Sequence, residues 1–258
     1  MIMEPYNPYF DLLSEIGMTR HPGGSKATDE LIKKCNIKKS SLVLDVGCGI
    51  GKTSCYLAKK CGCKVIGIDI SKIMIEKAKE RSKKEGVIDL VDFFLADAQK
   101  LPFNDDQFDS VISESVTSFM EHKDSILNEY CRVTKLGGYV GLNEASWIKE
   151  NPPTESNILF TITGINKILT SKEWTKLLIN ERLNDLNFNT YKFKMLNQIV
   201  DIGLINLFKS MFKLFNLYIT SSYYRDLLNL MARDLAIDFS ILKNIFECLG
   251  YGIFVGRK

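Results

Sequence analysis

The chain has 258 residues, of which 45% are hydrophobic and 25% charged, and its net charge is +3. These values are typical of a soluble globular protein with one large domain, and the small charge argues against a nucleic-acid partner. The sequence shows no secretory signal and no apolar stretch long enough to cross a membrane. Seven cysteines without an export signal favour reduced thiols and a cytoplasmic location. No metal site is expected, because the closest cysteine pair, Cys61 and Cys63, lacks further ligands at a useful spacing.

The N-terminal segment, residues 1–27, is polar and aromatic and is expected to form a lid. Its Tyr6, Tyr9 and Phe10 would either close over a ligand or pack against the domain. Thr28 is a candidate N-cap for the first helix.

Strands and helices are predicted to alternate as far as residue 147. Strands are expected at 41–46, 64–70, 91–97, 108–115 and 137–145, with helices at 52–61, 71–85 and 121–134. This order predicts an α/β fold, with βαβ units that build a mostly parallel Rossmann-like sheet covered by helices on both faces. Ligands bind such sheets at the carboxyl ends of the strands.

The pattern is less regular after residue 147. We expect a helix at 171–183 capped by Ser171, a strand at 189–196, helical structure at 200–248 and a last strand at 250–258. The sheet then has seven strands. We divide the chain into a core (28–147), the rest of the sheet with a connecting helix (148–199), a helical insertion (200–249) and a closing strand (250–258).

The stretch LDVGCGIGKTS, which contains the end of the first strand, holds three alternating glycines. A phosphate-binding P-loop has the pattern G-x-x-x-x-G-K-[ST]. Gly51, Lys52 and Thr53 supply its end, but its first glycine would have to stand at Val46. The loop is therefore one residue too short to wrap a phosphate, and an ATPase is disfavoured.

A dinucleotide site needs G-x-G-x-x-G, whereas the glycines here stand at positions 47, 49 and 51. Asp45 also precedes the first of them by two residues. A carboxylate at this place would repel a pyrophosphate and would suit a ligand that carries positive charge.

These features resemble the class I S-adenosylmethionine (SAM)-dependent methyltransferases, of the type that includes small-molecule and quinone methyltransferases. LDVGCGIG matches the glycine motif of that family, and the stretches at 96–109 and 132–144 resemble later motifs. The resemblance implies that SAM is the cofactor and S-adenosylhomocysteine (SAH) the product, with Asp69 on the ribose hydroxyls and Asp97 on the adenine amino group. The implied cofactor-binding residues are Asp45, Gly47, Cys48, Gly49, Gly51, Asp69, Ile70, Asp97, Ala98 and Glu114.

Methyl transfer from SAM requires a base only when the acceptor must lose a proton. Glu144, expected to end the fifth strand at the cleft rim, and His122, at a helix start, are the candidates. Each is more simply explained as an ordinary surface or loop residue. A SAM-binding module or partner protein without enzymatic activity is the alternative function.

The helical insertion carries apolar residues three and four positions apart: Leu204, Leu207, Phe208, Met211, Phe212, Phe215 and Tyr218. This spacing indicates one apolar helix face, which we expect to cap the pocket of the methyl acceptor. A dimer face, a membrane-surface helix and simple core packing are the alternatives. We therefore expect a small-molecule acceptor that is partly apolar or aromatic, no stable membrane insertion, and a monomer or homodimer.

Overall fold

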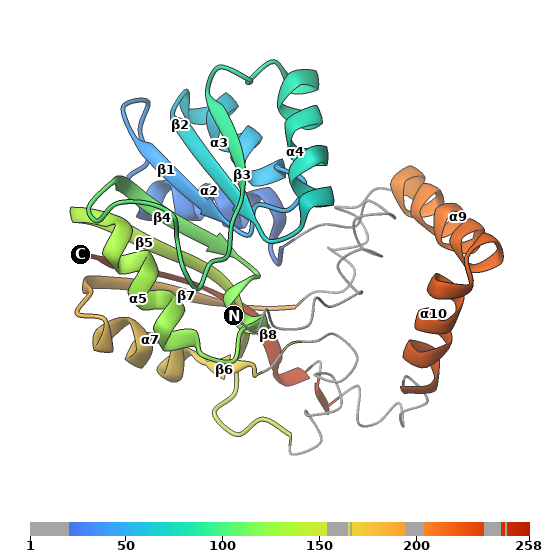
Figure 1. Cartoon of the computed structure of the whole chain (residues 1–258). Coiled ribbons are helices and arrows are strands. Elements are labelled where there is room, and N and C mark those ends of the chain that lie inside the picture. The colour runs from blue at the N-terminus through green and yellow to red at the C-terminus, as the bar shows by residue number, and fades with distance from the viewer. Residues whose placement is uncertain (1–20, 154–164, 166, 194–203, 235–243, 246) are drawn as a thin grey trace.

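The computed structural model describes residues 21–153, 165, 167–193, 204–234, 244–245 and 247–258 (Figure 1). The sheet has the order β3-β2-β1-β4-β5-β8-β7, and β6 pairs with β5. The strands are β1 (Leu42–Val46), β2 (Lys64–Asp69), β3 (Val91–Leu95), β4 (Phe108–Glu114), β5 (Thr134–Trp147), β6 (Leu169–Thr170), β7 (Asn184–Lys192) and β8 (Leu249–Arg257). The seven predicted strands are thus present, and β6 is a short addition.

Strands β1 to β6 pair in parallel, whereas β8 lies antiparallel between β5 and β7. The chain runs outward from β1 to β3 and then returns to the other side of β1 with β4. The order of the strands therefore reverses between β1 and β4, and the carboxyl ends of these two strands mark the place where an open α/β sheet binds its ligand.

Helices cover both faces of the sheet, as predicted (Figure 1). They are α2 (Gly24–Lys34), α3 (Lys52–Cys61), α4 (Lys72–Glu85), α5 (Lys123–Val133) and α7 (Ser171–Asn180), with the short 3₁₀ helix η1 (Thr117–Phe119) after β4. One apolar cluster joins the sheet to α2, α3 and α4, and a second joins it to α5 and α7.

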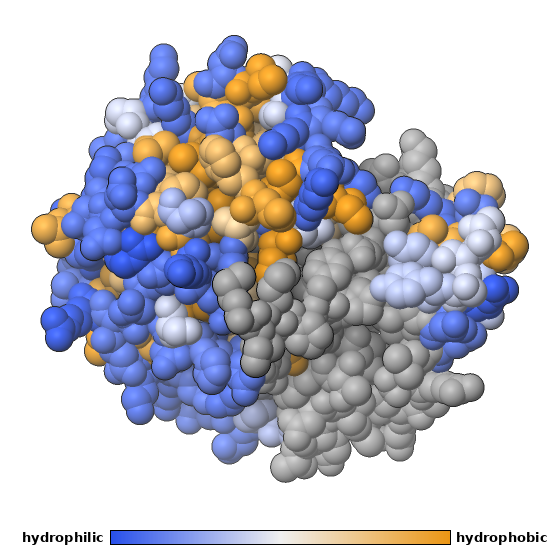
Figure 2. Space-filling model, in the orientation of Figure 1, coloured by the Kyte–Doolittle hydropathy of each residue, from blue (hydrophilic) through white to orange (hydrophobic). Residues whose placement is uncertain are grey.

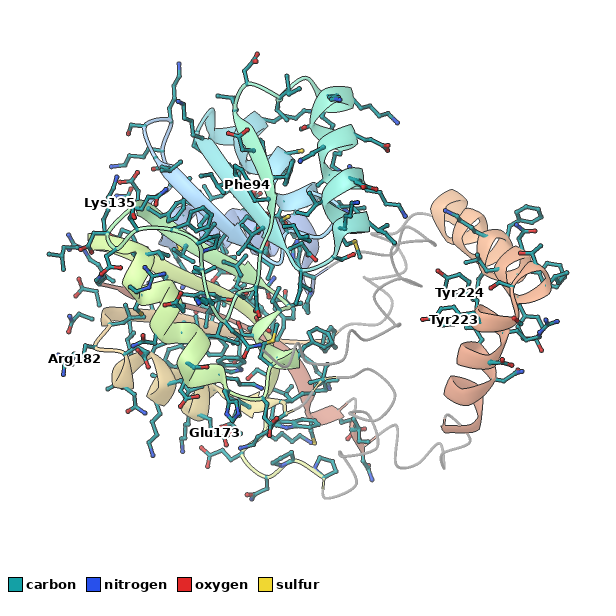
Figure 3. All side chains as sticks on the ribbon, viewed as in Figure 1. Phe94, Lys135, Glu173, Arg182, Tyr223 and Tyr224 are labelled. Carbon is teal, nitrogen blue, oxygen red and sulfur yellow. The ribbon has the colours of Figure 1, made fainter. Side chains whose placement is uncertain are left out.

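Two of the three predicted helix caps differ from the structure. Ser71 caps α4 as predicted, since its hydroxyl accepts from the backbone N–H of Met74. Thr28 lies inside α2, which starts at Gly24, because its side chain donates to Glu114 instead. Thr170, rather than Ser171, caps α7, where it forms a capping box with Glu173 (Figure 3).

The helical insertion forms α9 (Leu204–Thr220) and α10 (Ser222–Asp234), two helices that pack against each other at the side of the sheet domain (Figure 1). Tyr223 and Tyr224 make an edge-to-face pair at the start of α10 (Figure 3). Phe212 and Phe215 on α9 are 75% and 62% exposed. No helix in the described part of the chain is long and apolar enough to cross a membrane.

Exposed apolar side chains gather at the edge strand β3 and the neighbouring start of α4 (Figure 2). Phe94 and Leu95 lie on β3, and Ile70 and Ile73 lie at the end of β2 and the start of α4. Ile70 also lines the cavity described below, so this apolar surface continues to its rim.

Candidate functional site

A cavity of about 470 Å³ lies at the carboxyl ends of β1, β2 and β4. One half is lined by the loop after β1 and by acidic residues at the ends of strands. The other half is apolar. The cavity brings together nine of the ten predicted cofactor residues: Asp45, Gly47, Cys48, Gly49, Asp69, Ile70, Asp97, Ala98 and Glu114.

The three glycines of the loop have different structural roles, although all of them have positive φ angles. A Cβ on Gly47 would lie 2.2 Å from a methyl carbon of Val116, whereas a Cβ on Gly49 would meet nothing within 4 Å. Gly51 does not line the cavity, and a Cβ there would lie 2.7 Å from the ring of Phe93. Gly51 thus allows close packing, and the backbone at Gly49 is open to a ligand.

Asp69, at the end of β2, fixes the shape of this loop. Its Oδ2 accepts from the N–H of Gly49 and its Oδ1 from the N–H of Ser71, both at 2.9 Å. Burial raises the pKa of Asp69, and these backbone donors oppose the effect. Asp97, after β3, accepts from the N–H of Gln99 at 2.9 Å. Both carboxyl groups lie on the cavity wall.

Asp45 is buried at the end of β1 and has one hydrogen-bond partner in the described structure, the hydroxyl of Ser54 at 2.5 Å. Burial raises the pKa of Asp45 to about 7, and the negative charge of Glu114 adds to the rise. The carboxyl group is therefore close to its titration point at neutral pH.

Glu114, at the end of β4, accepts hydrogen bonds from four side chains. Oε1 accepts from Thr28 and Thr53, both at 3.0 Å, and Oε2 accepts from Asn143 and from Nδ1 of His21, both at 2.9 Å. Burial raises the pKa of Glu114, but His21 and the other donors outweigh burial and leave that pKa lowered. His21 also lines the cavity, which the sequence did not indicate.

Ser115 follows Glu114 and has a φ of 60°, which is uncommon for a residue other than glycine. It lines the cavity, and its Oγ is buried without a hydrogen-bond partner in the described part of the chain. A free hydroxyl on a strained backbone at a cavity wall is typical of a ligand contact.

A methyltransferase-domain family matches residues 44–142. The uncharacterized methyltransferase YodH of Bacillus subtilis (strain 168) is 35% identical over 171 residues, which cover 66% of this chain and 72% of YodH. The chain belongs to the class I SAM-dependent methyltransferases.

Other proteins that resemble this methyltransferase include a curated relative and two solved structures. Methyltransferase GfsG of Streptomyces halstedii is 37% identical over 119 residues, but the match spans only 43% of GfsG and 46% of this chain. A solved SAM-dependent methyltransferase from Geobacter sulfurreducens, in complex with S-adenosyl-L-homocysteine, has a TM-score of 0.76 at 18% identity, covering 98% of this chain and 99% of that one. The [4+2]-cyclase SpnF has the same TM-score at 19% identity, covering 96% of this chain and 92% of its own. The fold alone therefore does not decide the chemistry.

The two predicted catalytic residues of the methyltransferase lie outside the cavity lining. β5 continues to Trp147, so Glu144 does not end the strand. Its Oε1 accepts from the N–H groups of Val116 and Thr117, and its Oε2 from the N–H and hydroxyl of Ser118. Glu144 thus holds η1 in place. His122 is exposed at the N-cap of α5. The geometry supports a catalytic role for neither.

The apolar half of the cavity is built from five separate parts of the chain. It comprises Val116, Phe119, Met120, Ala145, Ile165, Ile168, Phe193 and Leu249. No described residue of α9 or α10 lines it, although the insertion was expected to cap the pocket. The side chain of Met211 and residues 1–20 of the predicted N-terminal lid (1–27) lie outside what the structure describes. Residues 24–27, which were assigned to the lid, form the start of α2.

Proposed function

We propose that the protein binds SAM in this cavity and transfers its methyl group to a small, partly apolar acceptor. The observation that carries the proposal is a single cavity in which a glycine loop and strand-end acids meet an apolar wall. Membership of the methyltransferase family supports it.

The polar half of the cavity has the donors and acceptors that SAM needs. Gly49 leaves the backbone open to a ligand, and Asp69 can accept from the hydroxyl groups of a ribose. Asp97 can accept from the amino group of adenine, and Asp45 suits a ligand that carries positive charge. A cavity of about 470 Å³ lies within the usual range for small-molecule sites. The residues present therefore fit SAM.

SAM supplies a methyl group on a positively charged sulfur, which makes the group reactive before the protein acts. The protein holds the acceptor in line and excludes water, and its apolar half is suited to both tasks. Phe119, Met120 and Phe193 provide flat and adaptable contact surfaces there. We therefore propose an acceptor with an apolar or aromatic portion.

The test is calorimetric titration with SAM and SAH, followed by incubation of the protein and labelled SAM with a metabolite extract. We expect binding of both and label on an apolar small molecule. Binding without label transfer to any acceptor would favour a SAM-binding module. Absence of SAM binding, with thermal protection by ATP instead, would refute the proposal.

A cytoplasmic location also remains a proposal, and the structure supports it to the extent that none of the seven cysteines forms a disulfide. We propose a monomer or homodimer, and sedimentation analysis distinguishes the two.

A further inference from the structure

An ion pair joins the loop before α2 to the end of β4, at the wall of the cavity. Nδ1 of His21 lies 2.9 Å from Oε2 of Glu114, and the two side chains are 14% and 4% exposed. The pair connects residues 93 positions apart, which lie on opposite sides of the glycine loop in the sequence. The exposed His122 is the other histidine of the chain, since it has two.

The hydrogen-bond partners settle where the protons lie. The amide of Asn143 donates to the carbonyl of Pro22 and to Glu114, both at 2.9 Å, so both of its hydrogens are used. Nδ1 of His21 lies 2.9 Å from Oε2 of Glu114 and 3.2 Å from the carbonyl oxygen of Pro22, and both oxygens accept. It also lies 3.0 Å from the amide nitrogen of Asn143, whose two hydrogens are already used, so Nδ1 carries a hydrogen of its own.

The other ring nitrogen is also placed as a donor. Nε2 of His21 lies 3.3 Å from the hydroxyl oxygen of Thr28. That hydroxyl already donates its hydrogen to Oε1 of Glu114 at 3.0 Å, so it is left as an acceptor for Nε2. With hydrogens on both nitrogens, His21 is an imidazolium.

Electrostatics agree with this assignment. Burial lowers the pKa of His21, but the charge of Glu114 and the hydrogen bonds to Glu114 and Pro22 outweigh burial, and the pKa is raised. The charged groups that act on His21 are Glu114 on β4 and, more weakly, Asp45 on β1. Thr28 on α2 and Asn143 on β5 contact it as neutral groups.

We propose that His21 is a positioning residue of the cofactor site, whose protonated ring neutralises Glu114 and fixes the cavity wall for binding. Loss of the proton leaves Glu114 as an uncompensated charge close to Asp45 and removes the link between Nε2 and Thr28. Both ring nitrogens are engaged within the protein, so His21 does not serve as the general base. This inference rests on the proposed function, because it concerns the binding of SAM and SAH.

The first experiment does not depend on SAM. The ring Cε1–H signals of the two histidines are followed by NMR through a pH titration and assigned with His122→Asn. We expect the midpoint of His21 to lie above the ordinary histidine value of about 6.5. Glu114→Gln and Thr28→Val should each lower that midpoint and leave the midpoint of His122 unchanged. A midpoint of His21 at or below about 6.5, or one that neither variant moves, would overturn the ion pair.

The second experiment measures binding of SAM and SAH by calorimetry for the wild type, His21→Asn and His122→Asn. Asn retains a donor towards Glu114 but no charge. We expect His21→Asn to weaken both ligands by the same factor, roughly tenfold, as for loss of a charge-assisted hydrogen bond. As pH rises through the midpoint of His21, the affinity of the wild type for SAH should fall relative to that of His21→Asn, which still contains Asp45 and so corrects for its titration.

Unchanged affinity of His21→Asn for SAH, or tighter binding of SAM alone, would overturn the positioning role. Tighter binding of SAM alone would indicate only that the charge of the cavity had changed. A wild type that binds neither ligand, with the NMR result as expected, would instead refute the proposed function and leave the ion pair intact.

Discussion

The carboxyl group of Asp45 makes a strong prediction about stability and pH. Its pKa is raised by burial from an ordinary value of 3.8 to about 7, with Ser54 opposing the rise. Between these pH values the folded protein keeps a proton that the unfolded chain has released. Because the folded state then binds more protons, the free energy of unfolding falls as pH rises from about 4 to about 7 and levels off above.

The magnitude follows from the shift of the pKa. A difference of about 3 units corresponds to roughly 4 kcal/mol, at ~1.36 kcal/mol per unit. Of this, roughly 2 to 3 kcal/mol should be lost between pH 5 and pH 8. The figure is an upper limit, because relaxation around a buried charge reduces its cost. Asp45→Asn keeps the shape of the side chain and removes the titration.

The assay is urea unfolding at pH 5 and pH 8, followed by circular dichroism. Between the two pH values the wild type should lose up to roughly 2 to 3 kcal/mol more stability than Asp45→Asn. Asp92→Asn, which changes an exposed carboxyl group on β3, is the matched control and should behave as the wild type. Equal losses in the wild type and Asp45→Asn would refute the assignment.

Four further predictions concern binding and turnover. Binding of SAM near pH 7 should release protons, detected by calorimetry in buffers of different ionisation enthalpy, and Asp45→Asn should abolish the release. Asp69→Ala should weaken SAM binding by roughly 10- to 150-fold in calorimetry, and unchanged affinity would place the ribose site elsewhere. Gly49→Val should abolish SAM binding with a native circular dichroism spectrum, because its φ of 52° suits glycine. Phe193→Ala should reduce acceptor turnover at constant SAM affinity, whereas Phe215→Ala does so only if α9 closes over the cavity.

The sequence was sufficient to predict the cofactor half of the site, because its residues lie at or just beyond the carboxyl ends of strands. An apolar run predicts a buried strand, and the residue after a parallel strand lies at the edge where ligands bind. Asp45, Asp69 and Asp97 follow this rule, and the structure places all three on one cavity.

Contacts between distant segments could not be predicted in this way. His21 lies in a loop without periodicity, and it reaches Glu114 only because α2 packs beside β5 and β8. The predicted position of Glu144 at the cleft rim was wrong for a local reason. Successive side chains of a strand point to opposite faces, and Glu144 points to η1, whereas Asn143 points to His21. The phase of this alternation relative to the cavity decides which residue faces it, and the sequence pattern of β5 does not define that phase.

The acids of the cavity differ in how the fold compensates them, and this difference bears on function. Asp69 is held by two backbone N–H groups, and Glu114 is paired with His21 and three further donors. Asp45 has a single hydroxyl partner among the described residues and remains near its titration point. A positive charge brought by a ligand would stabilise its ionised form more than that of its neighbours, which are compensated already. Among these acids, Asp45 is therefore the one whose ionisation should respond most to the charge of the cofactor. Through this ionisation, cofactor binding is coupled to the stability of the domain.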